Sequence, residues 1–418
     1  MIIKRLEIEN FKALRSVALD LDARANVFAG VNGAGKSTLI QAVQLMFGRY
    51  VFAMRFGRPS GRGPMLKELR IGADRVHLAI AAEHEGSRFT WKIDRAFKGL
   101  HSRKTDQDLS ELRAFIATQL EKLDAPETAN VPIFTTYPVG RAVLEIPLHV
   151  RTKESYSQAL AFQATALNTA RPFRTFFTWF RNREDYENER RLEDPDYRDP
   201  QIAAVRNAVE HLMPGFTDLR VRRRPLRMVA SKEGVEFEID TLSDGEKGLL
   251  AMAGDLARRL SLANPNRARP DEGDGIVLID ELELHLHPAW QRNAVHGLLK
   301  AFPNIQFIFT THSPQVLSEL RPEQTFLLKE GVAISASRSY GMDSTHVLRE
   351  LMGDPGRPLV VEKEINEIYQ GLEVGDVESS ERRLQGLEST MGGDDPVLTV
   401  ARARIRRGKV LRDRAVHR

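Results

Sequence analysis

The 418-residue sequence contains no cysteine, which excludes disulfides, iron–sulfur clusters, thiolate zinc sites and a cysteine nucleophile. This composition fits a reducing compartment, so the cytoplasm is the expected location. No run of about 18 apolar residues is present to span a bilayer, and the first eight residues alternate like a strand and are too charged for a signal peptide. Long apolar heptads are also lacking, which argues against a long coiled coil.

Excess charge of either sign is small as well. The chain has 61 Lys and Arg against 57 Asp and Glu, a formal net charge of +4, so bulk charge only weakly favours an anionic partner. Basic residues gather at residues 220–227 and again at residues 402–414. Each cluster either contacts nucleic acid or forms a solvated strand edge or helix face, and the lack of interleaved aromatic residues favours the second interpretation.

The sequence does contain four short motifs in a fixed order. They are a glycine loop at residues 30–37 (GVNGAGKS), a signature turn at 242–246 (LSDGE), an acidic strand end at 276–281 (IVLIDE) and a histidine strand end at 310–313 (TTHS). Any one of them could arise by chance. The ordered set predicts one composite site for a nucleoside triphosphate.

The glycine loop has the chemistry that phosphate binding requires. Glycines let the chain curl tightly, so that backbone N–H groups converge on phosphate oxygens at the start of a helix. Lys36 places a cation at the β and γ phosphates, and the Ser37 hydroxyl is a candidate Mg²⁺ ligand. The amides come from Asn32, Gly33, Ala34, Gly35, Lys36, Ser37 and Thr38.

Two further motifs lie at the ends of apolar strands. Asp280 and Glu281 follow the strand at residues 276–279; Asp280 is suited to hold Mg²⁺, and Glu281 to orient and deprotonate the attacking water. His312 follows the strand at 306–311, where its imidazole could contact the γ phosphate. Alone, the carboxylates could mark a surface strand end and the histidine a core or cap residue. His285 and His287 make a weak metal pair without further ligands.

The signature turn supports two interpretations that are compatible with each other. Ser243 and Glu246 have the spacing of a capping box for the following helix. A capped helix start with Asp244 and Gly245 also offers free amides and a helix dipole to an anion, here the γ phosphate bound to a second protomer.

Strands alternate with helices along residues 1–355, so the expected fold class is α/β with a mainly parallel sheet. Residues 75–97 predict paired strands of an antiparallel β subdomain. A charged helical insertion is expected at about residues 150–212, with an exposed helical segment at 176–200. Residues 356–418 predict a C-terminal helical appendix with a basic tail.

The four motifs together resemble the ATP-binding-cassette (ABC) heads of the SMC, Rad50 and RecF class, over most of residues 1–350. The resemblance implies an ABC-type P-loop ATPase head that uses ATP and Mg²⁺. In such proteins ATP is sandwiched between two heads, and each head supplies its signature to the glycine loop of the other. The segment Asn10-Phe11-Lys12 is similar to a segment of those heads whose basic residue lies near the nucleotide, which makes Lys12 a candidate contact.

A narrower resemblance rests on residues 176–180, 242–250, 284–288 and 306–316 and on the helical tail. These strings are similar to AAA-family ATPases of prokaryotic anti-phage systems, above all the Septu ATPases, which also occur in retron loci. This likeness implies a homo-oligomer, at least a dimer, with an HNH-type nuclease partner that nucleotide controls.

Some positions depart from these families. The signature reads Ser-Asp-Gly-Glu where transporters commonly have Ser-Gly-Gly-Gln, and no glutamine loop is obvious, with Gln158 and Gln163 as weak candidates. Asp394-Asp395 predicts a helix start and not a nuclease site. Three hypotheses stay open: an ATPase whose hydrolysis gates an effector, an ATP-bound scaffold or sensor with negligible turnover, and a DNA-repair ATPase that binds DNA through residues 222–224.

Overall fold

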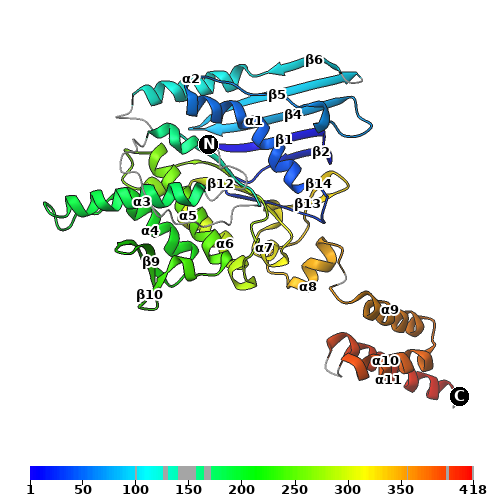
Figure 1. Cartoon of the computed structure of the whole chain (residues 1–418). Coiled ribbons are helices and arrows are strands. Elements are labelled where there is room, and N and C mark those ends of the chain that lie inside the picture. The colour runs from blue at the N-terminus through cyan, green and yellow to red at the C-terminus, as the bar shows by residue number, and fades with distance from the viewer. Residues whose placement is uncertain are drawn as a thin grey trace. The chain divides into compact units, whose positions relative to one another are not determined.

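A computed structural model describes residues 1–98, 101–125, 130–139, 157–163, 171–354, 356–391 and 395–416. The chain divides into two compact units, Met1–Val347 and Leu348–Arg418 (Figure 1). Among the helices in these described ranges, none is long and apolar enough to cross a membrane. Part of the insertion expected at about residues 150–212, namely residues 150–156 and 164–170, lies outside the described residues.

One large sheet organises the first unit. Its antiparallel half contains β6 (His101–Asp108), β5 (Ser87–Lys98), β4 (Arg75–His84), β1 (Ile2–Phe11) and β2 (Leu14–Asp20). Its other half contains β14 (Val332–Ser335), β13 (Thr325–Lys329), β3 (Ala25–Ala29), β12 (Ile305–Thr311), β11 (Gly275–Ile279) and β7 (Ile133–Tyr137). All eleven strands are hydrogen-bonded in that order. The α/β fold class is confirmed, and the antiparallel strands continue the same sheet.

The parallel strands of the second half carry the motifs. Every residue of β3, β7, β11 and β12 is buried, as expected for apolar strands covered on both faces of a parallel sheet. The register pairs Ile279 of β11 with Phe309 of β12 and with Tyr137 of β7, and Thr311 of β12 with Ala29 of β3. The segments that follow these four strands therefore emerge at one edge of the sheet.

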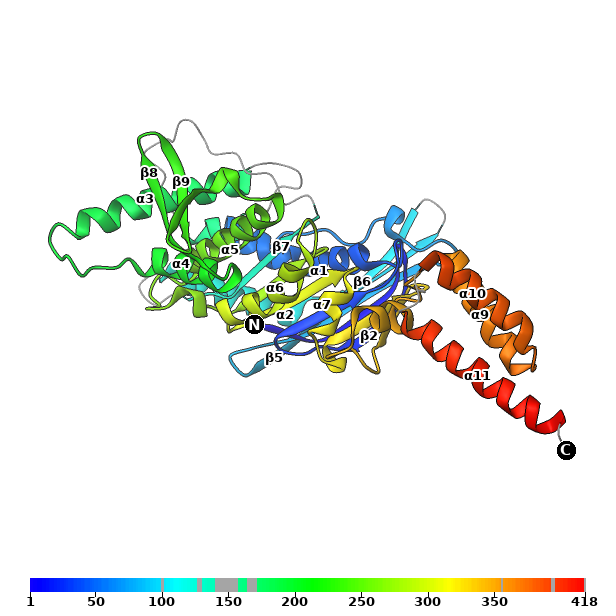
Figure 2. The same ribbon diagram turned by 90° about the horizontal axis from the view of Figure 1, so that it is seen from below.

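Helices cover this sheet and place the remaining motifs. They are α1 (Lys36–Phe56), α2 (Ser110–Asp124), α3 (Arg171–Arg190), α4 (Pro200–Leu212), α5 (Asp244–Ala263), α6 (Pro288–Ala301), α7 (Pro314–Ser318) and α8 (Ser344–His346). A small antiparallel sheet of β8 (Phe216–Arg223), β9 (Leu226–Lys232) and β10 (Val235–Glu238) lies beside α3 and α4 (Figure 2).

The expectation that residues 176–200 form an exposed helical segment is only partly right. Residues 171–190 are helical, but the first half of α3 is packed against α5, and Phe176, Trp179 and Phe180 are fully buried. Glu187 is buried too, and the Arg206 guanidinium on α4 pairs with its carboxylate at 3.1 Å. This ion pair offsets the cost of burying the charge. The charge density that suggested a solvated helix in fact includes internal ion pairs.

The second unit contains α9 (Leu359–Glu373), α10 (Val377–Met391) and α11 (Pro396–Val416). These helices share an apolar core that includes Ile368, Leu384, Leu398 and Ile405. The basic tail lies on α11, where Arg402 pairs with Glu388 and Lys409 with Glu381, each at 2.6 Å.

Candidate nucleotide-binding site

The glycine loop joins β3 to α1 and has the backbone that its sequence requires. Gly33 and Gly35 adopt left-handed conformations with φ of 80° and 108°, which other residues rarely adopt. At Gly35 a Cβ atom would also lie 2.7 Å from Leu14 Cδ2. The Lys36 ammonium folds back over the loop and donates to the carbonyl oxygens of Gly30 at 2.8 Å and Val31 at 3.1 Å.

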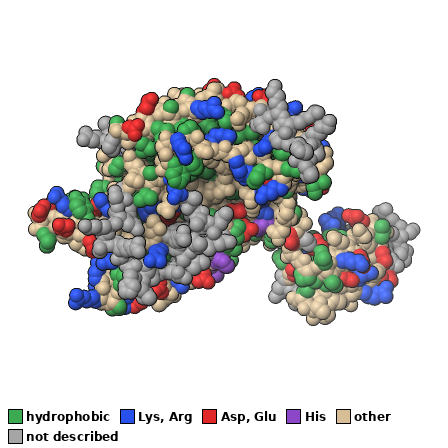
Figure 3. Space-filling view, turned by 45° about the horizontal axis from the view of Figure 1, so that its top comes forward, with side chains coloured by type: hydrophobic (Ala, Val, Ile, Leu, Met, Phe, Trp, Pro, Cys, Tyr) green, Lys and Arg blue, Asp and Glu red, His purple; other side chains and the backbone are tan. Residues whose placement is uncertain are grey.

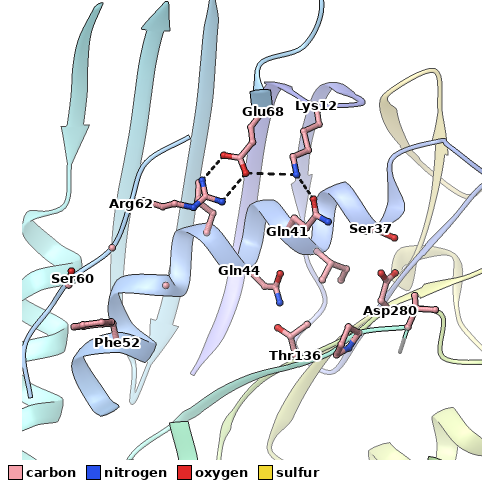
Figure 4. Close-up of a pocket in the computed structure, with 16 residues that line it drawn as sticks. Lys12, Ser37, Gln41, Gln44, Phe52, Ser60, Arg62, Glu68, Thr136 and Asp280 are labelled. Atoms are coloured by element: carbon pink, nitrogen blue, oxygen red, sulfur yellow. Dashed lines mark hydrogen bonds and ion pairs between the residues drawn. The ribbon is translucent and has the colours of Figure 1, made fainter. Parts of the chain in front are cut away.

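The acidic strand end lies beside this loop. Asp280 is buried and accepts a hydrogen bond from the Thr310 hydroxyl, and that hydroxyl also accepts the Glu281 N–H at 2.8 Å. Glu281 has a φ of 49°, so the chain turns sharply between the two carboxylates. Asp280 and Ser37 line the same cavity (Figure 4). Two oxygen ligands from the protein suit Mg²⁺, which completes its shell with water and phosphate oxygens.

His312 completes the cluster. Its Nδ1 lies 3.5 Å from Lys36 Nζ, and its Nε2 lies 4.0 Å from a Glu281 carboxylate oxygen. Burial and the neighbouring Lys36 charge lower the pKa of His312, so the neutral ring is favoured. Burial also lowers the pKa of Lys36, although the carboxylates of Glu281, Glu283 and Asp280 act in the opposite direction and raise it. A neutral His312 that accepts from Lys36 at Nδ1 carries its proton on Nε2 and directs it towards Glu281.

Sequence reasoning missed Glu283, which holds the histidine turn. Its carboxylate accepts the Thr311 hydroxyl at 2.7 Å and the backbone N–H of His312. Gln291 of α6 adds a second tie, because it donates to the Leu286 carbonyl at 2.8 Å and accepts the Ser313 hydroxyl at 2.6 Å. The available signal was a third carboxylate two positions after Glu281.

Lys12 lies on the opposite wall of the cavity. Its ammonium donates to Gln41 of α1 at 2.7 Å and lies 3.8 Å from Glu68, which the Arg62 guanidinium binds at 2.6 and 2.8 Å (Figure 4). The cavity has a volume of about 710 Å³, and its floor is a ridge of α1 that includes Ser37, Gln41 and Gln44. No sequence motif pointed to Gln41, Arg62 or Glu68.

Among the described residues directly after β7, which end at Val139, there is no glutamine. Pro138 and Val139 at the end of β7 line the cavity at that place. The side chain of Gln158 instead donates to the Ala263 carbonyl at the end of α5, 3.2 Å away. The Gln163 carbonyl accepts from Arg259 of α5 at 2.8 Å. Neither candidate lines the large cavity.

The signature turn forms the capping box that its spacing predicted. The Ser243 hydroxyl accepts the Glu246 N–H at 3.4 Å, and the Glu246 carboxylate accepts the Ser243 N–H at 3.0 Å. Gly245 packs against the loop after β11, where an added Cβ would lie 2.3 Å from the His285 carbonyl oxygen. Among the described residues, no hydrogen bond or ion pair joins this turn to the glycine loop. The structure therefore brings three of the four motifs together within one chain.

The other flagged side chains have structural partners. His287 accepts the Ala289 N–H and so caps α6. The arginines of residues 220–227 are largely neutralised: Arg222 pairs with Glu236, Arg223 with Glu184 and Asp185, and Arg227 with Glu238. This pairing weighs against the hypothesis that the 222–224 cluster is a DNA contact.

Two family models match the sequence. Residues 1–117 match the model described as "AAA ATPase domain", and residues 153–318 match the one described as "AAA domain, putative AbiEii toxin, Type IV TA system". The chain is 30% identical over 417 residues to the "Retron Ec83 probable ATPase" of Escherichia coli, across 84% of this chain and 76% of that protein. It is 26% identical over 343 residues to the "Septu protein PtuA" of Bacillus mycoides, across 78% and 40% of the two chains.

Among solved structures, the SMC head domain from Thermotoga maritima aligns at 17% identity with a TM-score of 0.45, over 81% of this chain and 100% of that domain. The retron protein is covered over 76% of its length at 30% identity, and both family models that match describe AAA domains. The chain therefore belongs to the family of the retron ATPases and is similar to the Septu protein.

Proposed function

We propose that the protein is a Mg-ATP-dependent ATPase whose heads assemble around ATP and regulate a partner nuclease in anti-phage defence. The observation that carries this proposal is the meeting of Lys36, Asp280, Glu281 and His312 at one sheet edge, beside the exposed Ser37 hydroxyl. These residues supply a cation, two carboxylates of different role and a neutral imidazole within one site. That set suits phosphoryl transfer to water, in which positioning and charge stabilisation do most of the work.

Each side chain has a separate task in this mechanism. Ser37 and Asp280 would hold Mg²⁺, which supplies charge neutralisation at the β and γ phosphates when bound. When ATP binds, the Lys36 ammonium leaves the carbonyl oxygens of Gly30 and Val31 and donates to phosphate oxygens instead. Glu281 accepts a proton from the attacking water. His312 directs its Nε2–H towards the space beside Glu281, where it can donate to the γ phosphate and stabilise the charge that develops there.

The signature turn is proposed to act on a second copy of the chain. Ser243 and Asp244 are exposed at the start of α5, so the helix N-terminus is accessible to an anion held by another head. Val31, at the tip of the glycine loop, is 60% exposed. Pairing two heads through these surfaces would complete both sites and would make assembly depend on ATP.

Similarity to known proteins supports the proposed defence role and the proposed nuclease partner. Relatives bear the names retron ATPase and Septu protein, and the Septu resemblance implies an HNH-type nuclease partner. We infer that nucleotide state in the heads controls such a nuclease, with the cytoplasm as the expected location.

Glu281→Gln separates the enzyme from the scaffold interpretation. We expect wild type to hydrolyse Mg-ATP, and the variant to lose at least about a hundredfold in turnover, as is usual for a general base, while it accumulates as a larger ATP-bound assembly. Steady-state phosphate release and light-scattering mass, each with and without Mg-ATP, measure both effects. Glu319→Gln, which removes a carboxylate that pairs with His296 on α6, is the matched control and should behave as wild type.

A different result would replace this mechanism. If wild type and Glu281→Gln both lack turnover and form the same oligomer with ATP, ATP is structural in this protein and the scaffold function is correct. If Glu281→Gln hydrolyses at the wild-type rate, Glu281 is not the base.

A further inference from the structure

A third concentration of positive charge follows the glycine loop, apart from the two clusters described above. Residues 49–75 contain seven Lys and Arg but only two acidic residues, Glu68 and Asp74. Figure 3 shows Lys and Arg side chains gathered around a hollow on the first unit, with hydrophobic side chains between them. Arg55 and Arg62 of this segment line cavities along α1, so part of this charge lies beside a concave surface, as a site for an anionic ligand requires.

The arginines at the C-terminal end of α1 are not neutralised. Arg49, Arg55 and Arg58, and Arg113 of α2, have no carboxylate partner in the part of the chain that the structure describes. Burial and the like charge of Arg113 lower the pKa of Arg49, because guanidinium groups of like charge repel each other. By contrast, Arg62 is bound by Glu68, and Arg222, Arg223 and Arg227 have carboxylate partners. An external anion would relieve the repulsion between Arg49 and Arg113.

One exposed and one half-buried aromatic ring lie among these arginines. Phe56 is 55% exposed, its ring centroid lies 4.6 Å from that of Phe52, and the Arg55 guanidinium lies 5.0 Å above it. Arg55, Phe52 and Phe56 border a cavity of about 380 Å³ that Phe134 and Phe162 also line. Aromatic faces beside a cationic groove are the features on which successive bases of a single strand stack.

This surface is separate from the phosphate-binding loop but continuous with its cavity. Ser37 and Phe56 are 19 residues apart on one helix, which corresponds to about 28 Å. The smaller cavity shares Gln44, Gly48 and Phe52 with the larger one, so a groove runs along α1 between the two ends. An extended ligand could therefore reach from the patch towards the nucleotide site.

We propose that single-stranded nucleic acid binds the basic–aromatic patch of Arg49, Phe52, Arg55, Phe56, Arg58 and Arg113. The guanidinium groups contact backbone phosphates, and the phenylalanine rings stack on bases. Duplex DNA is a poorer ligand, because its bases are already stacked and cannot reach Phe56. This assignment goes beyond the proposed ATPase function and does not require ATP hydrolysis.

The test measures binding of the full chain, without nucleotide, to a fluorescent oligothymidylate of about 20 nucleotides, a length that exceeds one groove. Fluorescence anisotropy is recorded between about 50 and 200 mM salt. We expect Arg55→Glu/Arg58→Glu to weaken binding at least tenfold and to reduce the salt slope by about 1.4, that is about 0.7 for each lost phosphate contact. Phe56→Ala should weaken it by about fivefold or more without changing the slope.

The matched control is Arg406→Glu/Arg407→Glu, the same charge change at two exposed residues of α11; it should bind as wild type. Thermal melting and ATP turnover of each variant separate loss of the patch from loss of the fold or of the nucleotide site. The proposal is overturned if wild type does not bind the oligonucleotide at the lowest salt, or if the patch variants bind it as tightly as wild type. Equal binding of a duplex that is insensitive to Phe56→Ala also overturns it.

Discussion

At the residue scale, the proposed catalytic cluster depends on Glu283, a side chain that has no chemical step assigned to it. Glu283 fixes the turn that carries His312, through the His312 N–H and the Thr311 hydroxyl. Without it, the imidazole loses the backbone contact that sets its position between Lys36 and Glu281. Such a displacement would slow ATP hydrolysis, because catalysis requires the reacting groups to be held in place.

Glu283→Ala is therefore expected to lower kcat about ten- to hundredfold, while the KM for ATP changes little, because the glycine loop is untouched. Glu283→Gln keeps one acceptor oxygen and should retain most of the rate. Steady-state ATP turnover measures both. A double variant with His312→Ala should be no slower than His312→Ala alone, since Glu283 acts through that histidine. Additive losses in the double variant would show that Glu283 has another role.

Sequence reasoning identified the side chains that are proposed to carry chemistry, but it missed those that hold them in position. Lys36, Asp280 and His312 belong to motifs whose spacing reflects the reaction. The partners Glu283, Gln41 and Glu68 come from segments whose meeting depends on the three-dimensional path of the chain. Local periodicity carries no information about such contacts, and neither does the count of charges in a cluster.

At the element scale, a buried ion network joins the end of β7 to α5. Asp255 of α5 binds Arg258 at 2.7 Å and Arg259 at 2.6 Å and accepts the Tyr137 hydroxyl at 3.0 Å. Arg259 also donates to the Ala161 carbonyl. The helix that presents the signature turn is thereby fastened to the strand beside the acidic strand end.

The same network makes stability depend on pH. Burial alone would raise the pKa of Asp255, but Arg259 and Arg258 outweigh it and hold the value at about 2, below the ordinary 3.8. A carboxylate with a lowered pKa in the folded state stabilises the fold above its unfolded pKa. We therefore expect this carboxylate to contribute about 2 kcal/mol to the free energy of unfolding at neutral pH. This contribution is lost as the pH falls from about 4 to about 2.

Asp255→Asn is expected to destabilise the first unit by about 3–5 kcal/mol at neutral pH, because it leaves two buried guanidinium groups without a counter-charge. Urea unfolding at neutral pH and at about pH 3 measures this; the gap between wild type and variant should narrow in acid. Asp343→Asn, at an exposed carboxylate with a lowered pKa, serves as the control. A gap that is equal at both pH values would contradict the assigned charge state of Asp255.

The buried parallel strands could be predicted from the sequence, but the position of α3 could not. The parallel strands are apolar throughout because both faces are covered, so β3, β11 and β12 are evident in the sequence. The first half of α3 was predicted as helix but misplaced at the surface, because its aromatic residues are packed against a helix some 70 residues later in the chain. Its charged residues pair internally with α4.

At the scale of the whole molecule, the two compact units have separate apolar cores. The second unit contains its own cluster, in which Leu384 of α10 is 3% exposed beside Ile368 and Leu398. A core of this size supports a cooperative transition that is weaker than that of the first unit, since small domains bury a smaller fraction of their surface.

Leu384→Asp should therefore unfold the second unit and leave the first intact. A buried charge without a partner in a small core costs more than such a unit can tolerate. We expect calorimetry to lose the lower of two transitions, with the main transition and the ATP turnover of the first unit unchanged. Glu378→Asp, a conservative change in the first turn of the same helix, should keep both transitions. If Leu384→Asp instead lowers the melting temperature of the whole chain in one step, the two units unfold cooperatively. Nucleotide binding to the first unit would then also change the stability of the second unit.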